Sequence, residues 1–157
     1  MESAIAFRAA PIRLVTFREF LQIAASGFHR HAQQGRHEMR ILHLEDDPND
    51  SLFIERSVRC QGIEATFIQV RTANEFHDAL KNDDFDIVIV DNSLPGISAP
   101  EAIAQAKAGH PATPVIVCSG AARGTDVTAG MKAGATAYVL KDDPSQLANA
   151  LNAACGR

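Results

Sequence analysis

The sequence is poor in cysteine and in long apolar runs, and both absences exclude classes of protein. Three widely spaced cysteines, Cys60, Cys118 and Cys155, form no CxxC pair, which favours reduced thiols over a disulfide framework or a zinc site. No apolar stretch approaches the roughly 18 to 20 residues that span a bilayer. Arginines interrupt the N-terminal region too often for a secretory signal. The sequence therefore predicts a cytoplasmic protein with no membrane partner.

The chain also has little excess charge. Its formal net charge is -4, with 22% charged and 46% apolar residues, which is typical of a soluble globular protein and argues against nucleic acid as a partner. A length of 157 residues accommodates one compact domain and an appendage.

From about Arg40 onward, short apolar segments alternate with segments of helical character. This alternation predicts an α/β fold, a doubly wound, five-stranded parallel sheet with helices on both faces. The expected strands are 41–44, 65–70, 86–90, 114–119 and 137–140, and the expected helices are 50–60, 73–82, 100–109, 122–133 and about 144–155.

Residues 1–38 differ from this pattern, and we expect them to form an N-terminal extension to a domain at 39–157. Thr16 and Glu19 are placed as a capping box for an amphipathic helix at 16–28. Its apolar stripe would dock on the domain or on a second copy of the chain, so a homodimer is one expected assembly. Alternatively, the domain begins at Met39 and the preceding residues add little.

Polar side chains follow four of the five expected strands. The residues are Glu45, Asp46, Asp91, Ser119 and Lys141. Since ligands of parallel sheets bind outside the carboxyl ends of the strands, these side chains should meet in one cleft. Clustered carboxylates need a compensating cation, and Mg²⁺ prefers oxygen ligands. With the metal and Lys141 in place, Asp91 would suit attack on a phosphoryl group. Taken alone, Asp91 could cap a turn and Asp46 a helix.

Four motifs in order resemble the receiver domain of two-component response regulators. They are "ILHLEDDPND", "DIVIVDNSLPG", "PVIVCSG" and "AGATAYVLK", and the likeness spans about residues 39–154. The resemblance implies the flavodoxin-like strand order 2-1-3-4-5. It also implies that Asp91 accepts a phosphoryl group from a histidine kinase or histidine phosphotransfer protein.

The resemblance assigns a role to each remaining motif residue. Ser119 and Lys141 would contact the phosphoryl oxygens, and Tyr138 would be the aromatic switch that follows Ser119. The implied Mg²⁺ ligands are Glu45, Asp46, Asp91 and the backbone carbonyl of Ser93.

Some positions depart from the family pattern. Ala99 replaces a common glycine, so a positive φ there would be strained, and Asp142 replaces a common proline, which makes a cis peptide improbable. Ser93 and Ala121 lack a carboxylate or amide to orient a hydrolytic water. We therefore expect a fairly persistent phosphoryl group.

The expected function is phosphorelay signal transduction by a protein that is not itself an enzyme. The chain ends at Arg157, after the fifth expected helix, so its output would be contact with an unidentified downstream protein or phosphate relay. One alternative is a pseudo-receiver, an interaction module that is never phosphorylated. Another is a phosphatase with an aspartate nucleophile, which would usually have an acid where Ser93 stands.

Overall fold

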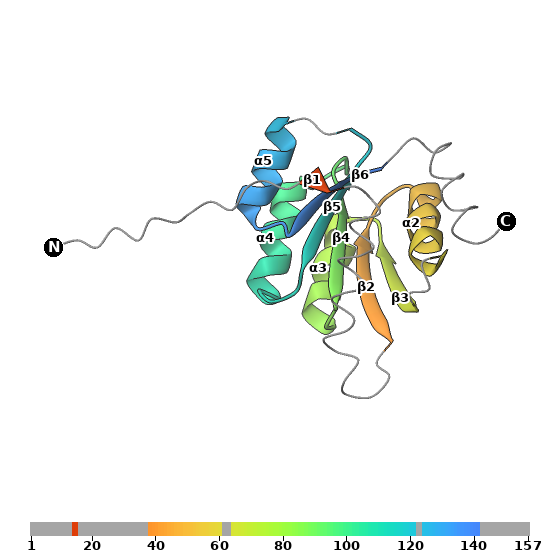
Figure 1. Ribbon diagram of the computed structural model, residues 1–157. Helices are drawn as coiled ribbons and strands as arrows, with labels where there is room; N and C mark the ends of the chain where they lie inside the picture. Colours follow the sequence, from red (N-terminus) through yellow and green to blue (C-terminus); the bar gives the residue numbers. More distant parts are fainter. Residues whose placement is uncertain (1–13, 16–37, 61–63, 122–123, 142–157) are drawn as a thin grey trace.

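A computed structural model describes residues 14–15, 38–60, 64–121 and 124–141 of the chain. Its centre is a parallel sheet in the order β1-β6-β5-β4-β2-β3 (Figure 1). The strands are β1 (Leu14–Val15), β2 (Met39–Leu44), β3 (Ala65–Val70), β4 (Ile87–Asp91), β5 (Val115–Ser119) and β6 (Ala137–Leu140). Without β1, the order is the predicted 2-1-3-4-5, so the doubly wound fold is confirmed.

Helices cover both faces of the sheet (Figure 1). They are α2 (Pro48–Cys60), α3 (Ala73–Asn82), α4 (Ala99–Gly109) and α5 (Gly124–Ala133). Ile54 and Val58 of α2 pack in one apolar core, whereas Phe76 of α3, Ile103 of α4 and Val127 of α5 pack in the other. The helices expected at 16–28 and 144–155 lie outside the described residues.

The central strands are apolar on both sides because both faces are covered. Every residue of β4 and β5 is buried, as the continuous apolar runs predict for parallel strands between two helical layers. Such strands have little freedom to shift. They therefore hold the side chains at their carboxyl ends in fixed positions.

The turn before α4 shows how the chain accommodates Ala99. Ser98 and Glu101 form a capping box, and Ala99 is the first residue of the helix. Among the described residues only glycines have positive φ, including Gly96 at 81°. Because Ala99 has an ordinary φ, the strain considered from the sequence does not arise. Asp142 lies outside the described residues.

The strand β1 was not predicted. Leu14 and Val15 pair in parallel with Tyr138 and Val139 of β6, so two residues of the N-terminal extension cover the edge of the sheet. An uncovered edge strand would present unpaired backbone groups. The division of the chain at residue 38 stays a prediction, but this part of the extension joins the sheet of the domain.

The cysteine prediction is wrong at one position. Cys60, the last residue of α2, is disulfide-bonded rather than reduced. Cys118 is a free thiol in the core, where burial raises its pKa to about 12. Cys118 is therefore protonated and unreactive at neutral pH.

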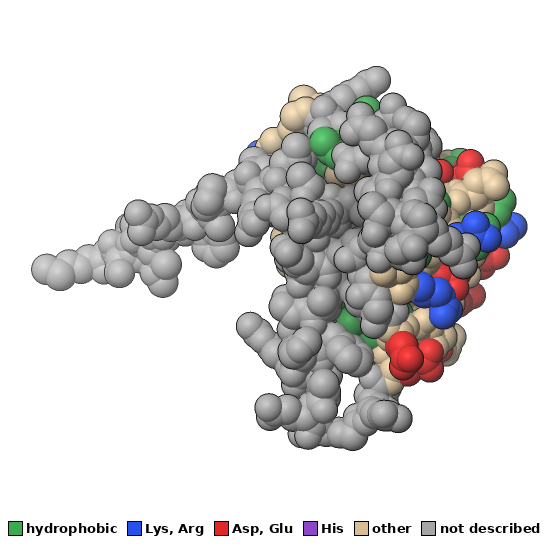
Figure 2. All heavy atoms as spheres, turned by 45° about the vertical axis from the view of Figure 1, so that its right-hand side comes forward, with side chains coloured by type: hydrophobic (Ala, Val, Ile, Leu, Met, Phe, Trp, Pro, Cys, Tyr) green, Lys and Arg blue, Asp and Glu red, His purple; other side chains and the backbone are tan. Residues whose placement is uncertain are grey.

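None of the described helices combines the length and hydropathy needed to cross a bilayer. Figure 2 shows acidic and basic side chains interspersed on the described part of the face in view. On α2, Arg59 and Glu55 form an ion pair with a nitrogen to oxygen distance of 2.9 Å.

Candidate functional site

The predicted site residues lie at the carboxyl ends of neighbouring strands. Asp91 ends β4, Ser119 ends β5, and Glu45 and Lys141 directly follow β2 and β6. The register aligns Asp91 with Cys118 and Ser119 with Leu140. The backbone N–H of Lys141 donates to the carbonyl of Ser119 at 2.6 Å. These pairings hold the ends of β4, β5 and β6 at one edge of the sheet.

The Lys141 ammonium lies among three carboxylates. Its Nζ is 2.8 Å from Oδ1 of Asp91, 2.7 Å from Oε2 of Glu45 and 2.7 Å from Oδ2 of Asp50. Lys141 and Glu45 are largely buried, with side chains 12% and 2% exposed, whereas that of Asp50 is 46% exposed. The structure thus brings together three predicted residues and adds one, Asp50, that sequence reasoning missed.

Burial and ion pairing act in opposite directions on the charges of this cluster. Burial disfavours the ammonium of Lys141, but hydrogen bonds to Asp50, Asp91 and Glu45 outweigh it and raise its pKa above the ordinary value. Burial raises the pKa of Glu45, although its hydrogen bond to Lys141 opposes that change. The cluster therefore holds one firmly protonated amine whose charge compensates buried carboxylates.

Backbone groups fix the side chain of Asp91. Its Oδ2 accepts a hydrogen bond from the N–H of Ser93 at 2.8 Å, while Oδ1 contacts Lys141. The next residue, Asn92, donates its backbone N–H to the carbonyl of Cys118 at 2.9 Å. Both oxygens of Asp91 are thus oriented before any ligand arrives, which is the preorganisation that favours a reaction at this carboxylate.

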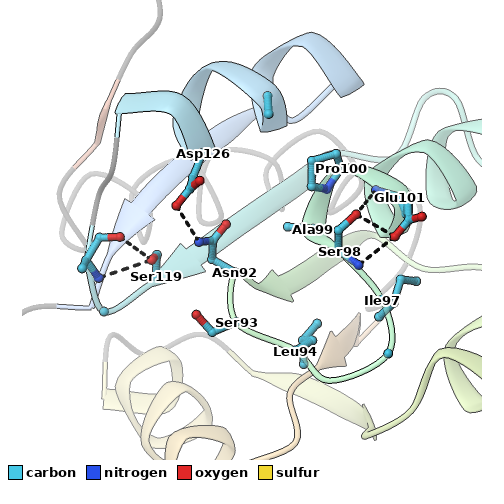
Figure 3. Close-up of a pocket in the computed structure, with 14 residues that line it drawn as sticks. Asn92, Ser93, Leu94, Ile97, Ser98, Ala99, Pro100, Glu101, Ser119 and Asp126 are labelled. Atoms are coloured by element: carbon cyan, nitrogen blue, oxygen red, sulfur yellow. Dashed lines mark hydrogen bonds between the residues drawn. The ribbon is translucent and has the colours of Figure 1, made fainter.

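Ser119 makes local contacts at the end of β5. Its Oγ donates to the carbonyl of Ala121 at 2.7 Å and accepts from the N–H of Ala121 at 3.3 Å (Figure 3). The hydroxyl is buried and would have to give up the contact with the Ala121 carbonyl to reach a group attached to Asp91.

Tyr138 occupies the core beneath this edge. Its ring is completely buried and faces α5, where a side chain added at Gly130 would meet it at 3.8 Å, and burial raises its pKa. Within the described part of the chain, its hydroxyl has no hydrogen-bond partner. The hydroxyl of Ser119 is nevertheless near enough to oppose this rise in the pKa of Tyr138.

A pocket adjoins the site on the side of α4 and α5 (Figure 3). It has a volume of about 1120 Å³ and is lined by the loops after β4 and β5 and by the starts of α4 and α5. Ser93 and Ser119 lie on its wall. Asn92 and Asp126 meet across it at 3.5 Å. The pocket therefore reaches the two residues that directly follow Asp91, which are Asn92 and Ser93.

The oxygen-rich cluster is suited in composition to a hard divalent cation. Glu45 and Asp91 are buried carboxylates beside each other, and Asp46 is exposed in the same loop. Among the described residues, no three Asp, Glu, His or Cys side chains are arranged as a closed metal site. Because Lys141 bridges the carboxylates, a cation would share them with the ammonium. The donor set suits Mg²⁺, which usually keeps several waters.

Comparison with known proteins places the chain in a family. Residues 41–152 match the response regulator receiver domain. The chain belongs to the response regulator receiver domain family. It is also 31% identical over 103 residues to the transcriptional regulatory protein TcrA of Mycobacterium tuberculosis, a match that covers 66% of this chain and 40% of TcrA. The match to TcrA thus spans well under half of that longer protein.

Solved receiver domains share the fold. The receiver domain of the sensor histidine kinase PA1611 from Pseudomonas aeruginosa, with a magnesium ion in its active-site cleft, superposes with a TM-score of 0.60 at 22% identity, covering 77% of this chain and 100% of that one. The phosphorylated cyanobacterial phytochrome response regulator RcpA has a TM-score of 0.65 at 19% identity, covering 76% and 91%. The receiver-domain resemblance of the sequence is therefore confirmed.

Proposed function

We propose that this receiver domain accepts a phosphoryl group on Asp91 and transmits the signal by phosphate relay or altered protein contacts. The observation that carries the proposal is the 2.8 Å contact between Asp91 and Lys141 at the carboxyl edge of the sheet. It pairs an oriented carboxylate with a firmly protonated amine, as in-line phosphoryl transfer requires. The donor would be a histidine kinase or a histidine phosphotransfer protein.

In the proposed reaction, a carboxylate oxygen of Asp91 forms a bond to phosphorus as the bond from phosphorus to the donor atom breaks. The electron pair of that bond leaves with the donor. Lys141 neutralises charge on the phosphoryl oxygens, and Ser119 turns from Ala121 to donate its hydroxyl hydrogen to one of them. The N–H of Ser93 holds Oδ2 of Asp91 in place through its 2.8 Å hydrogen bond.

We propose that Mg²⁺ is held by the predicted ligand set. Its members are the side chains of Glu45, Asp46 and Asp91 and the backbone carbonyl of Ser93. When bound, the cation would supply positive charge at the transferring oxygens. The magnesium-containing receiver domain of PA1611 supports this assignment by fold similarity.

The proposed output begins at Ser119 and Tyr138. Movement of the Ser119 hydroxyl away from Ala121 would open space near the buried ring of Tyr138, whose unpartnered hydroxyl could follow it. Because Tyr138 lies on β6, which pairs with β1, this rearrangement would reach an edge of the sheet. A downstream protein would recognise that altered surface.

The test is incubation with acetyl phosphate and Mg²⁺ followed by measurement of the intact mass. We expect a phosphate-sized increase in the wild type that is absent in Asp91→Ala and that requires the cation. A mass increase that persists in Asp91→Ala would place the chemistry elsewhere. No increase in the wild type would favour the pseudo-receiver, and turnover of a small phosphomonoester would favour the phosphatase.

A further inference from the structure

We propose that Asp50 is the positioning residue for Lys141 in the phosphorylated site. The inference rests on the proposed function and extends it to a residue outside the predicted ligand and phosphate-binding sets. The Oδ2 of Asp50 accepts a hydrogen bond from the Lys141 ammonium at 2.7 Å, across 91 positions of the chain. Asp50 would hold the amine where it must meet the phosphoryl oxygens.

The argument follows from what each carboxylate around Lys141 does when the site is loaded. Asp91 becomes the phosphorylated group, so its Oδ1 no longer offers Lys141 a free carboxylate. Glu45 is an expected ligand of the cation, which competes with the ammonium for its oxygens. Asp50 has neither duty. It is therefore the one of the three contacts that involves neither the phosphorylated group nor an expected ligand of the cation.

The position of Asp50 in α2 suits this role. The helix begins two residues before it. The carbonyl of Asp47 accepts from the N–H of Ser51 at 3.0 Å, and Oδ1 of Asp47 accepts from the N–H of Asn49 at 2.8 Å. Ile54 and Val58 anchor the helix in the core. Asp50 thus extends from a fixed support, and a rigid support is what gives a positioning residue its effect.

Because Asp50 is partly exposed, its carboxylate has only a small desolvation cost in the ion pair with Lys141. Its side chain is 46% exposed, whereas that of Lys141 is 12% exposed, so the carboxylate keeps much of its hydration and the partly exposed pair contributes only modestly to stability. Its expected contribution is to orientation. A small displacement of a catalytic amine can reduce a reaction rate strongly while the fold stays intact.

The experiment compares Asp50→Asn with Asp47→Asn and Asp50→Glu in the full chain. Asp47→Asn removes the same charge from the same helix start, keeps a good N-cap residue and touches no Lys141 atom. Phosphorylation by acetyl phosphate is followed at increasing Mg²⁺ concentration. We expect Asp50→Asn to lower the rate at saturating Mg²⁺ about fivefold, with the half-saturating concentration changed less than about twofold. Asp47→Asn should stay within about twofold of the wild type, and Asp50→Glu should recover part of the rate.

A second readout needs no group transfer. Beryllofluoride with Mg²⁺ mimics an attached phosphoryl group, and its binding is followed by the rise in thermal unfolding temperature that it causes. Asp50→Asn should weaken beryllofluoride binding about fivefold and leave the unfolding temperature of the free protein near that of the wild type.

The outcomes separate this inference from the proposed function. If the wild type and Asp47→Asn are phosphorylated and Asp50→Asn matches them, Asp50 does not position Lys141 and the inference is wrong. Equal losses of phosphorylation rate in Asp50→Asn and Asp47→Asn would show a general charge effect. A change confined to the half-saturating Mg²⁺ concentration would make Asp50 a metal ligand. Either outcome would overturn the inference. A wild type that accepts neither acetyl phosphate nor beryllofluoride contradicts the proposed function itself.

Discussion

His43 gives the protein a predictable sensitivity to acid. It lies in β2, completely buried, and neither ring nitrogen has a hydrogen-bond partner among the described residues. Burial, with the charge of Lys141 as the next cause, lowers its pKa from 6.5 to about 3. The folded protein therefore keeps this imidazole neutral at a pH where the unfolded chain protonates it.

The sign and size of the effect follow from proton linkage. Below about pH 6.5 the unfolded state binds one proton more than the folded state at His43, so stability falls as the pH falls, until about pH 3. From about pH 7.5 to about pH 5 this single group should remove about 2 kcal/mol from the free energy of unfolding.

Urea denaturation at the two pH values measures this loss without Mg²⁺ or a phosphoryl donor. His43→Leu, which suits the apolar contacts of the ring with Phe67, should lose about 2 kcal/mol less than the wild type between the two pH values. His77→Gln, at an exposed position on α3, should leave the wild-type difference almost unchanged. An identical pH dependence in the wild type and His43→Leu would refute the reasoning.

Three further predictions concern the site and the edge of the sheet. With Ser93 and Ala121 in place, the phosphoryl group should persist well beyond seconds in Mg²⁺ after the donor is removed; loss of label within seconds would contradict this expectation. Ser119→Ala should leave the unfolding temperature nearly unchanged but slow phosphorylation, as measured by intact mass over time, and a wild-type rate would exclude Ser119 from phosphoryl contact. Val15→Pro removes a backbone donor from β1, so hydrogen exchange should quicken in β6 and stay unchanged in β4; unaltered β6 exchange would mean that β1 gives the edge no protection.

The regular part of the fold was predictable because its signals are local. The apolar runs of β4 and β5 indicated covered strands, and their terminal residues, Asp91 and Ser119, follow from the rule that parallel strands share one carboxyl edge. The same rule placed Glu45 and Lys141 beside them. The positions of these residues required no knowledge of side-chain rotamers.

The parts that sequence reasoning missed depend on distant contacts. Asp50 had the signature of an ordinary acid in the first turn of a helix, and its contact with Lys141 crosses 91 positions. The two residues of β1 are too few to show a period. His43 stood in an apolar strand segment, but nothing in the sequence indicated that both ring nitrogens would lack partners.

The central claim is that Asp91 carries the phosphoryl group. Borohydride reduces an aspartyl phosphate to homoserine, so treatment of the phosphorylated protein followed by peptide mass spectrometry locates the modified residue. We predict homoserine at position 91 in the peptide that contains the end of β4, formed only after incubation with donor and Mg²⁺. Homoserine at Asp46, Asp50 or any other acid, or a phosphorylated protein with no homoserine at all, would contradict the account.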